Sequence, residues 1–355
     1  MVIVKYGSAA LVLLLALFWP IPAWSCPFCS PAASDLYTVI SSSTAVCKVA
    51  RVGPSKFKLL RVLRGNAQVG RVVLARDPGG ELKADSVIVL ATVANPNQPF
   101  WSEPARVLNP HEFAFFNSLI EAKSDDRRRD IAAGHFTSAS KLVSDAAYNV
   151  LSAASVDEVQ ARTQLVGVKA LIERVLDSNV PEDRKGLMYI MLVPYLNAQD
   201  KGWLRAALLK PRPKPQAMYL PGLMAAYAEV DGPSAIEEMT QVYLTAQTSV
   251  SDAFNPISGF RFIGTDSKSE ITREAARKVL RSELGNPERG PFVIDALREW
   301  KDYSVAPLVE KMAYDHATTP WVAAAVVGYF KSFHTPAAGK ALQRLRREFP
   351  DMVGR

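Results

Sequence analysis

Hydrophobic and polar positions alternate with a two-residue period in the first third of the chain, which is typical of β-strands. Four segments fit this pattern, namely residues 44–52, 56–64, 70–76 and 86–93. Gly65-Asn66 and the run Asp77-Pro-Gly-Gly80 would turn the chain between them. The last segment is almost entirely apolar, so we expect it in the interior of the sheet. The spacing of these strands predicts a small antiparallel β-barrel or sandwich.

From Pro110 onward the hydrophobic period becomes that of α-helices and stays so. Val305, Leu308 and Met312, for example, share one face of a helix. Helical segments of about 10–16 residues alternate with joints rich in Gly, Pro and Asn. The predicted fold class is therefore α+β: a small antiparallel β domain followed by an all-α array.

The last helical section repeats itself. Residues 297–304 align with residues 327–334 at an offset of 30 residues, which places Trp300 over Phe330 and Lys301 over Lys331. A helix pair that recurs at about this length predicts a HEAT-like α-solenoid. The alternative is an irregular helical bundle in which two amphipathic helices match by chance.

The N-terminus has the layout of a secretory signal peptide. Residues 1–25 contain Lys5, an apolar run over 9–19, and small residues before the expected cleavage after Ser25. An uncleaved anchor, or a lipid on Cys26, would be the only routes to a membrane. The expected organisation is a signal peptide over 1–25, a β domain over 26–108, a helical block over 109–210 and HEAT-like repeats over 216–355.

The formal net charge of +7 is spread along the chain. The tightest basic run, Arg127-Arg128-Arg129, follows Asp125-Asp126 and predicts a solvated helix face. No basic stripe interleaved with aromatic residues is present, so we do not expect nucleic-acid binding.

Three cysteines form the sharpest chemical signal. Cys26-Pro-Phe-Cys29 is a CxxC pair, similar to the glutaredoxin motif, and can act as a redox dithiol. No βα unit precedes it, so we favour a structural disulfide in an oxidising compartment. Either one of Cys26 and Cys29 bonds to Cys47, or Cys26 and Cys29 form a small ring while Cys47 stays buried and reduced.

Other candidate chemistry is weak. The four histidines lack metal-ligand spacing, so no metal site and no cofactor are expected. Ser138 and Lys141 have SxxK spacing without the companion motifs of that chemistry, and Ser138 is predicted near the start of a helix. Trp203, Trp300 and Trp321 are predicted as core residues, whereas an exposed Trp101 at the domain junction is hypothesised to line a cleft.

The order of the motifs carries a resemblance. The signal peptide, Cys26-Pro-Phe-Cys-Ser30, Lys58-Leu-Leu-Arg-Val-Leu-Arg-Gly65 and Leu297-Arg-Glu-Trp-Lys-Asp-Tyr-Ser-Val305 together resemble an uncharacterised family of secreted bacterial proteins. The resemblance covers residues 26–333 and implies export and architecture, but no activity; Cys47 departs from the family pattern. The β domain is also similar to the OB-like module of netrins and TIMPs. It lacks the several disulfides and Cys-x-Cys start of that module, so protease inhibition is not implied.

These expectations favour an exported, non-enzymatic binding or scaffold protein, secreted or periplasmic, whose helical surface docks a protein partner. The alternative is a thiol–disulfide protein of the cell envelope that uses Cys26 and Cys29.

Overall fold

A computed structural model describes residues 36–78, 85–209, 213–316 and 319–350. The chain forms two compact units, residues 1–162 and 163–355. The boundary after Arg162 lies inside the helical block expected over 109–210. The signal peptide expected over 1–25, together with Cys26 and Cys29, lies outside the described residues.

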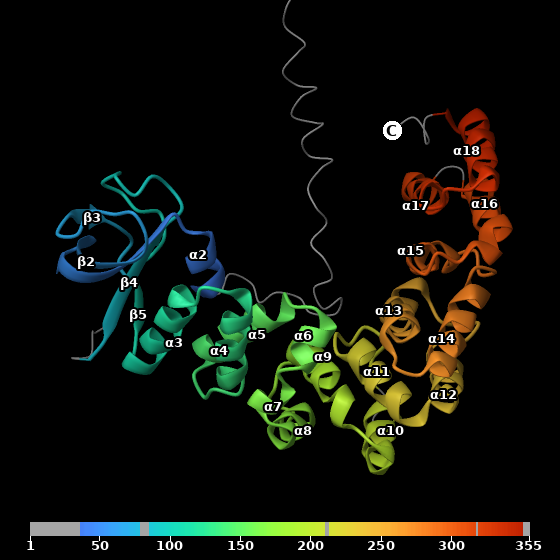
Figure 1. Ribbon diagram of the computed structural model, residues 1–355, viewed down its shortest axis with the longest axis horizontal. Coiled ribbons are helices and arrows are strands. Elements are labelled where there is room, and N and C mark those ends of the chain that lie inside the picture. Colours follow the sequence, from blue (N-terminus) through green and yellow to red (C-terminus); the bar gives the residue numbers. More distant parts are fainter. Residues whose placement is uncertain (1–35, 79–84, 210–212, 317–318, 351–355) are drawn as a thin grey trace, which may run out of the picture. The chain divides into compact units, whose positions relative to one another are not determined.

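The first unit contains the sheet and five helices of the described chain (Figure 1). Its elements are α2 (Leu36–Ser42), β1 (Ala45–Gly53), β2 (Lys56–Gly65), β3 (Val72–Leu74), β4 (Val87–Thr92), β5 (Arg106–Leu108), α3 (Pro110–Glu121), α4 (Asp125–His135), α5 (Lys141–Ser152) and α6 (Val156–Gln160).

The described residues of the second unit form helices joined by turns and loops, with no strand among them (Figure 1). Its α-helices are α7 (Thr163–Val166), α8 (Val168–Leu176), α9 (Glu182–Leu192), α10 (Lys201–Leu209), α11 (Leu220–Asp231), α12 (Pro233–Tyr243), α13 (Val250–Asp266), α14 (Glu270–Glu283), α15 (Ile294–Glu299), α16 (Ala306–Asp315), α17 (Pro320–Lys331) and α18 (Pro336–Glu348). Short 3-10 turns join them: η1 (Val193–Tyr195), η2 (Ala198–Asp200), η3 (Gly290–Val293) and η4 (Tyr303–Val305).

The sheet is antiparallel, with strand order β3-β2-β1-β4-β5. The four strands predicted from the sequence are present, and the apolar β4 lies inside the sheet between β1 and β5, as expected. The three-residue β5 was not predicted. The α+β class is confirmed, with one five-stranded sheet ahead of a helical region.

One face of the sheet holds the core of the β domain. Cys47 and Val49 of β1 pack there with Phe57 and Leu59 of β2. Trp101 joins them and is 0% exposed, so the hypothesis that it lines a cleft is wrong. The reason is local. The backbone N–H of Trp101 donates to the Leu74 carbonyl at 2.8 Å, and this bond holds the segment against the edge strand β3.

Helix α3 covers part of the opposite face. A capping box fixes its start, because Asn109 Oδ1 accepts from the Glu112 N–H and the Glu112 carboxylate accepts from the Asn109 N–H. The ammonium of Lys48 lies 5.6 Å from the centre of the Phe113 ring. Lys48 therefore points away from Cys47 and toward α3, as the two-residue period predicts.

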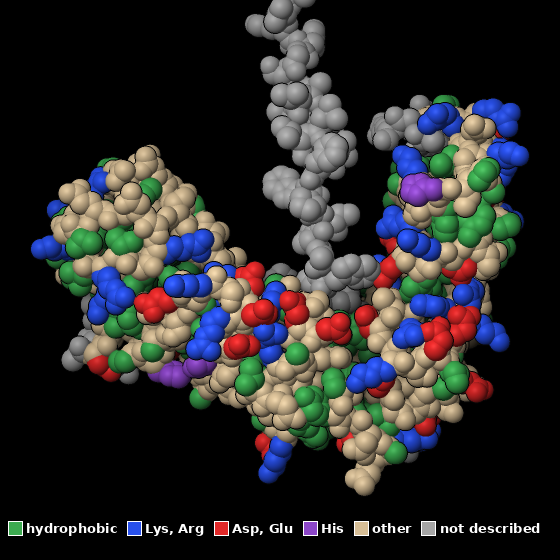
Figure 2. Space-filling model, in the orientation of Figure 1, with side chains coloured by type: hydrophobic (Ala, Val, Ile, Leu, Met, Phe, Trp, Pro, Cys, Tyr) green, Lys and Arg blue, Asp and Glu red, His purple; other side chains and the backbone are tan. Residues whose placement is uncertain are grey.

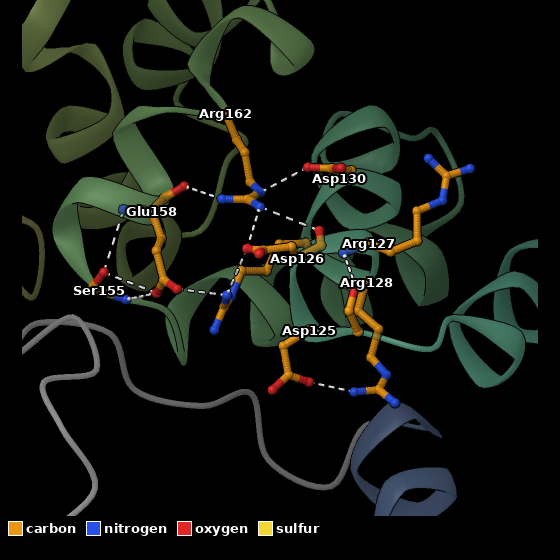
Figure 3. A network of polar contacts seen from close by, with 10 residues as sticks. Asp125, Asp126, Arg127, Arg128, Asp130, Ser155, Glu158 and Arg162 are labelled. Atoms are coloured by element: carbon orange, nitrogen blue, oxygen red, sulfur yellow. Dashed lines mark hydrogen bonds and ion pairs between the residues drawn. The ribbon is translucent and has the colours of Figure 1, made fainter.

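An arginine at the end of the first unit ties α4 to α6 (Figure 3). The Arg162 guanidinium donates to Asp130 Oδ1 at 3.0 Å, to Asp126 Oδ1 at 3.0 Å and to the Glu158 carbonyl at 2.8 Å. Arg129 adds an ion pair with Glu158 at 2.7 Å. The basic run on α4 therefore forms ion pairs as well as facing solvent. Arg127 is exposed, whereas Arg128 and Arg129 are half-buried.

We predict that Arg162→Ala lowers the free energy of unfolding by about 2 kcal/mol, because it removes several charge-assisted hydrogen bonds from a buried guanidinium. Denaturant titration measures the loss. Arg127→Ala, on the same helix without an ion pair among the described residues, should change stability by less than about 0.5 kcal/mol. Equal effects of the two substitutions would show that the network does not hold α6.

The second unit is built from helices that pack on their second neighbours as well as on their hairpin partners. Helix α11 lies against both α9 and α13, and nine consecutive residues from Leu220 to Ala228 are buried. At Gly222 a side chain would clash, because an added Cβ would lie 2.5 Å from the Gly186 carbonyl oxygen. Figure 1 shows α13, α15 and α17 following one another on one side of this unit, with α14, α16 and α18 on the other.

No helix in the described ranges combines the length and the apolar character needed to span a bilayer.

Candidate functional site

Of the three cysteines, only Cys47 lies in the described part of the chain. It is 0% exposed in β1 and forms no disulfide with another described residue. Burial raises the pKa of this thiol to about 11, so it is neutral and unreactive near pH 7. A free, buried Cys47 is what the ring pairing of Cys26 with Cys29 requires. Both pairings stay predictions, because Cys26 and Cys29 lie outside the described residues.

The SxxK pair does not assemble into a site. Ser138 lies ahead of α5, and its hydroxyl oxygen accepts a hydrogen bond from the Ser140 N–H at 3.3 Å. The Lys141 ammonium instead pairs with Asp145, one turn further along α5. Ser138 thus lies near a helix start, as the sequence predicts. Among the described residues no group of three or more His, Cys, Asp or Glu side chains lies close enough together to hold a metal.

A groove of about 630 Å³ crosses the second unit where α13, η3, α15 and α17 meet. Its apolar lining includes Phe254 of α13, Phe292 of η3 and Trp321 of α17. Trp321 is 49% exposed and Phe254 58% exposed, although both are large apolar residues. The prediction that Trp321 is a core residue is therefore wrong. The other two tryptophans predicted in the core, Trp203 and Trp300, are half-buried.

The helix period explains why Trp321 faces outward. The buried face of α17 includes Val322, Val326 and Phe330. Trp321 shares the other face with the small residues Ala324 and Ala325, which also line the groove. One large aromatic residue among small ones on a helix face is the sequence signal for this site, but the sequence alone does not show that this face is uncovered.

The three rings form a continuous ladder. The centroids of Phe254 and Phe292 are 6.5 Å apart with the rings edge to face, and those of Phe292 and Trp321 are 5.1 Å apart. Because the rings come from three different elements, α13, η3 and α17, and lie side by side, an extended ligand can contact all three at once. Such edge-to-face and tilted contacts also hold the rings in place without a ligand.

An ion pair sheltered from solvent positions Phe292. Arg289 Nε lies 2.7 Å from Glu283 Oε2, and the Arg289 guanidinium donates to the carbonyls of Thr245 and Thr248 at 2.8 and 3.0 Å. These contacts tie the start of η3 to the end of α14 and to the loop before α13. Burial outweighs the attraction of Arg289 and raises the pKa of Glu283 above its usual value.

Charged groups of both signs line the same groove. Arg261 Nη2 lies 2.7 Å from Glu299 Oε2, and Arg298 Nη2 lies 3.0 Å from Asp295 Oδ1. The side chains of Arg261, Arg298 and Asp295 each remain 42–50% exposed. Figure 2 shows charged side chains of both signs over the region of α13 to α15.

The chemistry of the groove lining suits the binding of a polypeptide. The groove offers apolar rings, guanidinium donors and carboxylate acceptors, which match the side chains, carbonyls and N–H groups of a polypeptide. It holds no cysteine, histidine or serine beside a base; Ser258, its one serine, donates to the Phe254 carbonyl within α13.

Comparison of the chain with protein-family models, with curated proteins and with solved structures finds no match. The resemblance to secreted proteins with a CPFC N-terminus therefore rests on the sequence motifs alone.

We predict that Cys47 resists iodoacetamide in the native chain and reacts fully in 6 M guanidinium, as measured by intact mass and peptide mapping. The folded thiol titrates near pH 11 and the unfolded thiol near pH 9.0. The contribution of the neutral thiol to the free energy of unfolding is therefore fully present below pH 9, and about 2 kcal/mol is lost as the pH rises through 11. Cys47→Ala should lack this part of the alkaline loss. A mass that shows Cys47 in a disulfide would contradict the prediction.

We predict that Arg289→Ala lowers the free energy of unfolding by about 3 kcal/mol, because it leaves the Glu283 carboxylate buried without its partner. Adding Glu283→Gln should recover about 1 kcal/mol of that loss. Arg298→Ala breaks a half-exposed pair and should cost less than about 1 kcal/mol. The result that would oppose this account is a double variant less stable than Arg289→Ala alone.

Proposed function

We propose that the chain is an exported, non-enzymatic binding protein whose helical unit docks an extended segment of a partner protein in the groove between α13, α15 and α17. The observation that carries this proposal is the exposure of Phe254 and Trp321 beside half-exposed arginines. Tryptophan and arginine dominate the binding energy of protein interfaces, because they combine large contact area with directed hydrogen bonds.

The repeat architecture supports the proposal. We infer a HEAT-like array because the packed helix pairs α11–α12, α13–α14 and α17–α18 recur along the unit, with α15 and α16 between the last two pairs. Alternate helices also pack together, α11 on α13 and α15 on α17. Three glycines, Gly186, Gly222 and Gly259, mark the close approaches of α9, α11 and α13. They are spaced 36 and 37 residues apart, which is closer to the usual HEAT period than the 30-residue offset in the sequence.

The β domain fits a barrel-like module in the same proposal. The Leu74 N–H donates to the Pro99 carbonyl at 2.7 Å, and the Ala105 N–H donates to the Arg76 carbonyl at 3.0 Å. The segment that leads into β5 thus also bonds to β3, at the other edge of the sheet. This second set of bonds supports the OB-like interpretation of the module.

The size of the groove defines the ligand. Packed helices lie about 8–10 Å apart, so a ligand that crosses α13, α15 and α17 spans about 20 Å. An extended chain rises about 3.3 Å per residue, which gives a bound segment of about six residues. Its apolar side chains would contact the ring ladder while its backbone bonds to Arg261, Arg298 and Asp295. The thiol–disulfide alternative rests on Cys26 and Cys29 and stays a prediction.

A random 12-residue peptide library displayed on phage tests this proposal with the full-length exported protein as target. Binding peptides should be rich in aromatic and large aliphatic residues. Phe254→Ala/Trp321→Ala should weaken their binding at least tenfold, because the two exposed rings that the bound peptide would cover are lost. Leu308→Ala is the matched control, since Leu308 is exposed to a similar degree on α16 outside the groove, and it should leave binding unchanged. If every selected peptide binds the double variant as tightly as the parent, the groove is not the docking site.

A further inference from the structure

The β domain carries a second surface that the groove proposal does not use. On the face of the sheet opposite its core, helix α3 contacts β2 and β5 and leaves the first half of β2 and the whole of β3 uncovered. Four large apolar side chains are exposed on this uncovered area, which we call the strand face: Leu60, Val72, Leu74 and Phe100. Figure 2 shows hydrophobic side chains at the surface over β2 and β3, with Lys and Arg side chains beside them.

The strand register places these residues together. Val72 and Leu74 pair with Lys58 and Lys56 across the antiparallel β2–β3 ladder. Leu60 lies further along β2, at the irregularity in the β1–β2 register between Leu59 and Arg61, and its side chain is exposed. Phe100 pairs with Leu74 in a parallel bridge, and because the next residue, Trp101, enters the core, Phe100 points outward.

The charge on the strand face has one sign. Lys56 and Lys58 are exposed between the apolar positions, and neither has a carboxylate partner among the described residues. The nearest basic residue on β2, Arg61, differs because it pairs with Glu121 of α3 at 3.3 Å. An exposed apolar group of this kind, bordered by lysines that pair with no described carboxylate, marks an interaction surface.

We propose that the strand face docks a second protein, one that presents aliphatic side chains bordered by Asp or Glu. A second copy of this chain is disfavoured, because Lys56 and Lys58 of both copies would meet across a self-complementary contact. A lipid surface is disfavoured as well, because the strand face lacks the Trp and Tyr residues that anchor proteins at the membrane interface. With the groove of the helical unit, the chain would then hold two different proteins.

In-cell photo-crosslinking from the strand face tests the proposal. Benzoylphenylalanine replaces Leu74 in the full-length protein, and the crosslinked peptide is identified by mass spectrometry. We expect a discrete adduct whose attached peptide carries Asp or Glu within a few residues of the crosslink. Lys56→Glu/Lys58→Glu should reduce its yield at least fivefold, and Leu60→Ser should reduce it too.

Matched variants separate this surface from the groove and from misfolding. Benzoylphenylalanine at Leu308 is the exposed control and should give no such adduct. Phe254→Ala/Trp321→Ala should leave the yield of the Leu74 adduct unchanged, whether or not the groove binds a peptide. Each variant is used only if its thermal midpoint matches that of the parent. We expect this match because the substituted side chains are exposed.

Four outcomes overturn the proposal: an adduct with this chain itself, an adduct with lipid, an adduct that persists after Lys56→Glu/Lys58→Glu, or no adduct from Leu74. Binding to phosphatidylglycerol vesicles that is lost in Leu60→Ser would likewise replace the protein partner by a membrane surface.

Discussion

The close packing of α11 between α9 and α13 is the constraint on which the helical unit depends. Nine successive residues of α11 are buried, so this helix has no face left for solvent. Its neighbours can approach only where side chains are absent: Gly222 faces Gly186 of α9, and Gly259 of α13 faces Met224 and Pro221. Helix α13 is fixed on this support with another side free, and that side supplies Phe254 and Arg261 to the groove.

Buried arginines tie neighbouring segments together at one joint in each unit. Arg162 and Arg289 lie in different units, yet each is sheltered, each pairs with a carboxylate, and each donates to carbonyls of neighbouring segments. A guanidinium suits this role because its five N–H groups reach several acceptors at once. In the second unit this joint also orients η3, so the position of Phe292 in the groove follows from the pairing of Arg289 with Glu283.

Local periodicity was sufficient to predict the strands and the change to helices. It identified β1, β2, β3 and β4, and it placed Lys48 opposite Cys47. It did not reveal β5, because three residues are too short for a two-residue period to stand out. The order of the strands also follows from pairings between distant segments, which no local pattern contains.

Periodicity was not sufficient to predict the candidate site. Periodicity distinguishes two faces of a helix, but it does not say which neighbour covers each face. Trp101 was hypothesised to be exposed and is fully buried, because backbone bonds to Leu74 hold it over the core. Trp321 was predicted in the core and is exposed, because the apolar face of α17 is already filled by Val322, Val326 and Phe330. Of these two residues only Trp321 marks apolar surface that the helix packing leaves uncovered, and a group of such exposed apolar side chains is typical of an interaction surface.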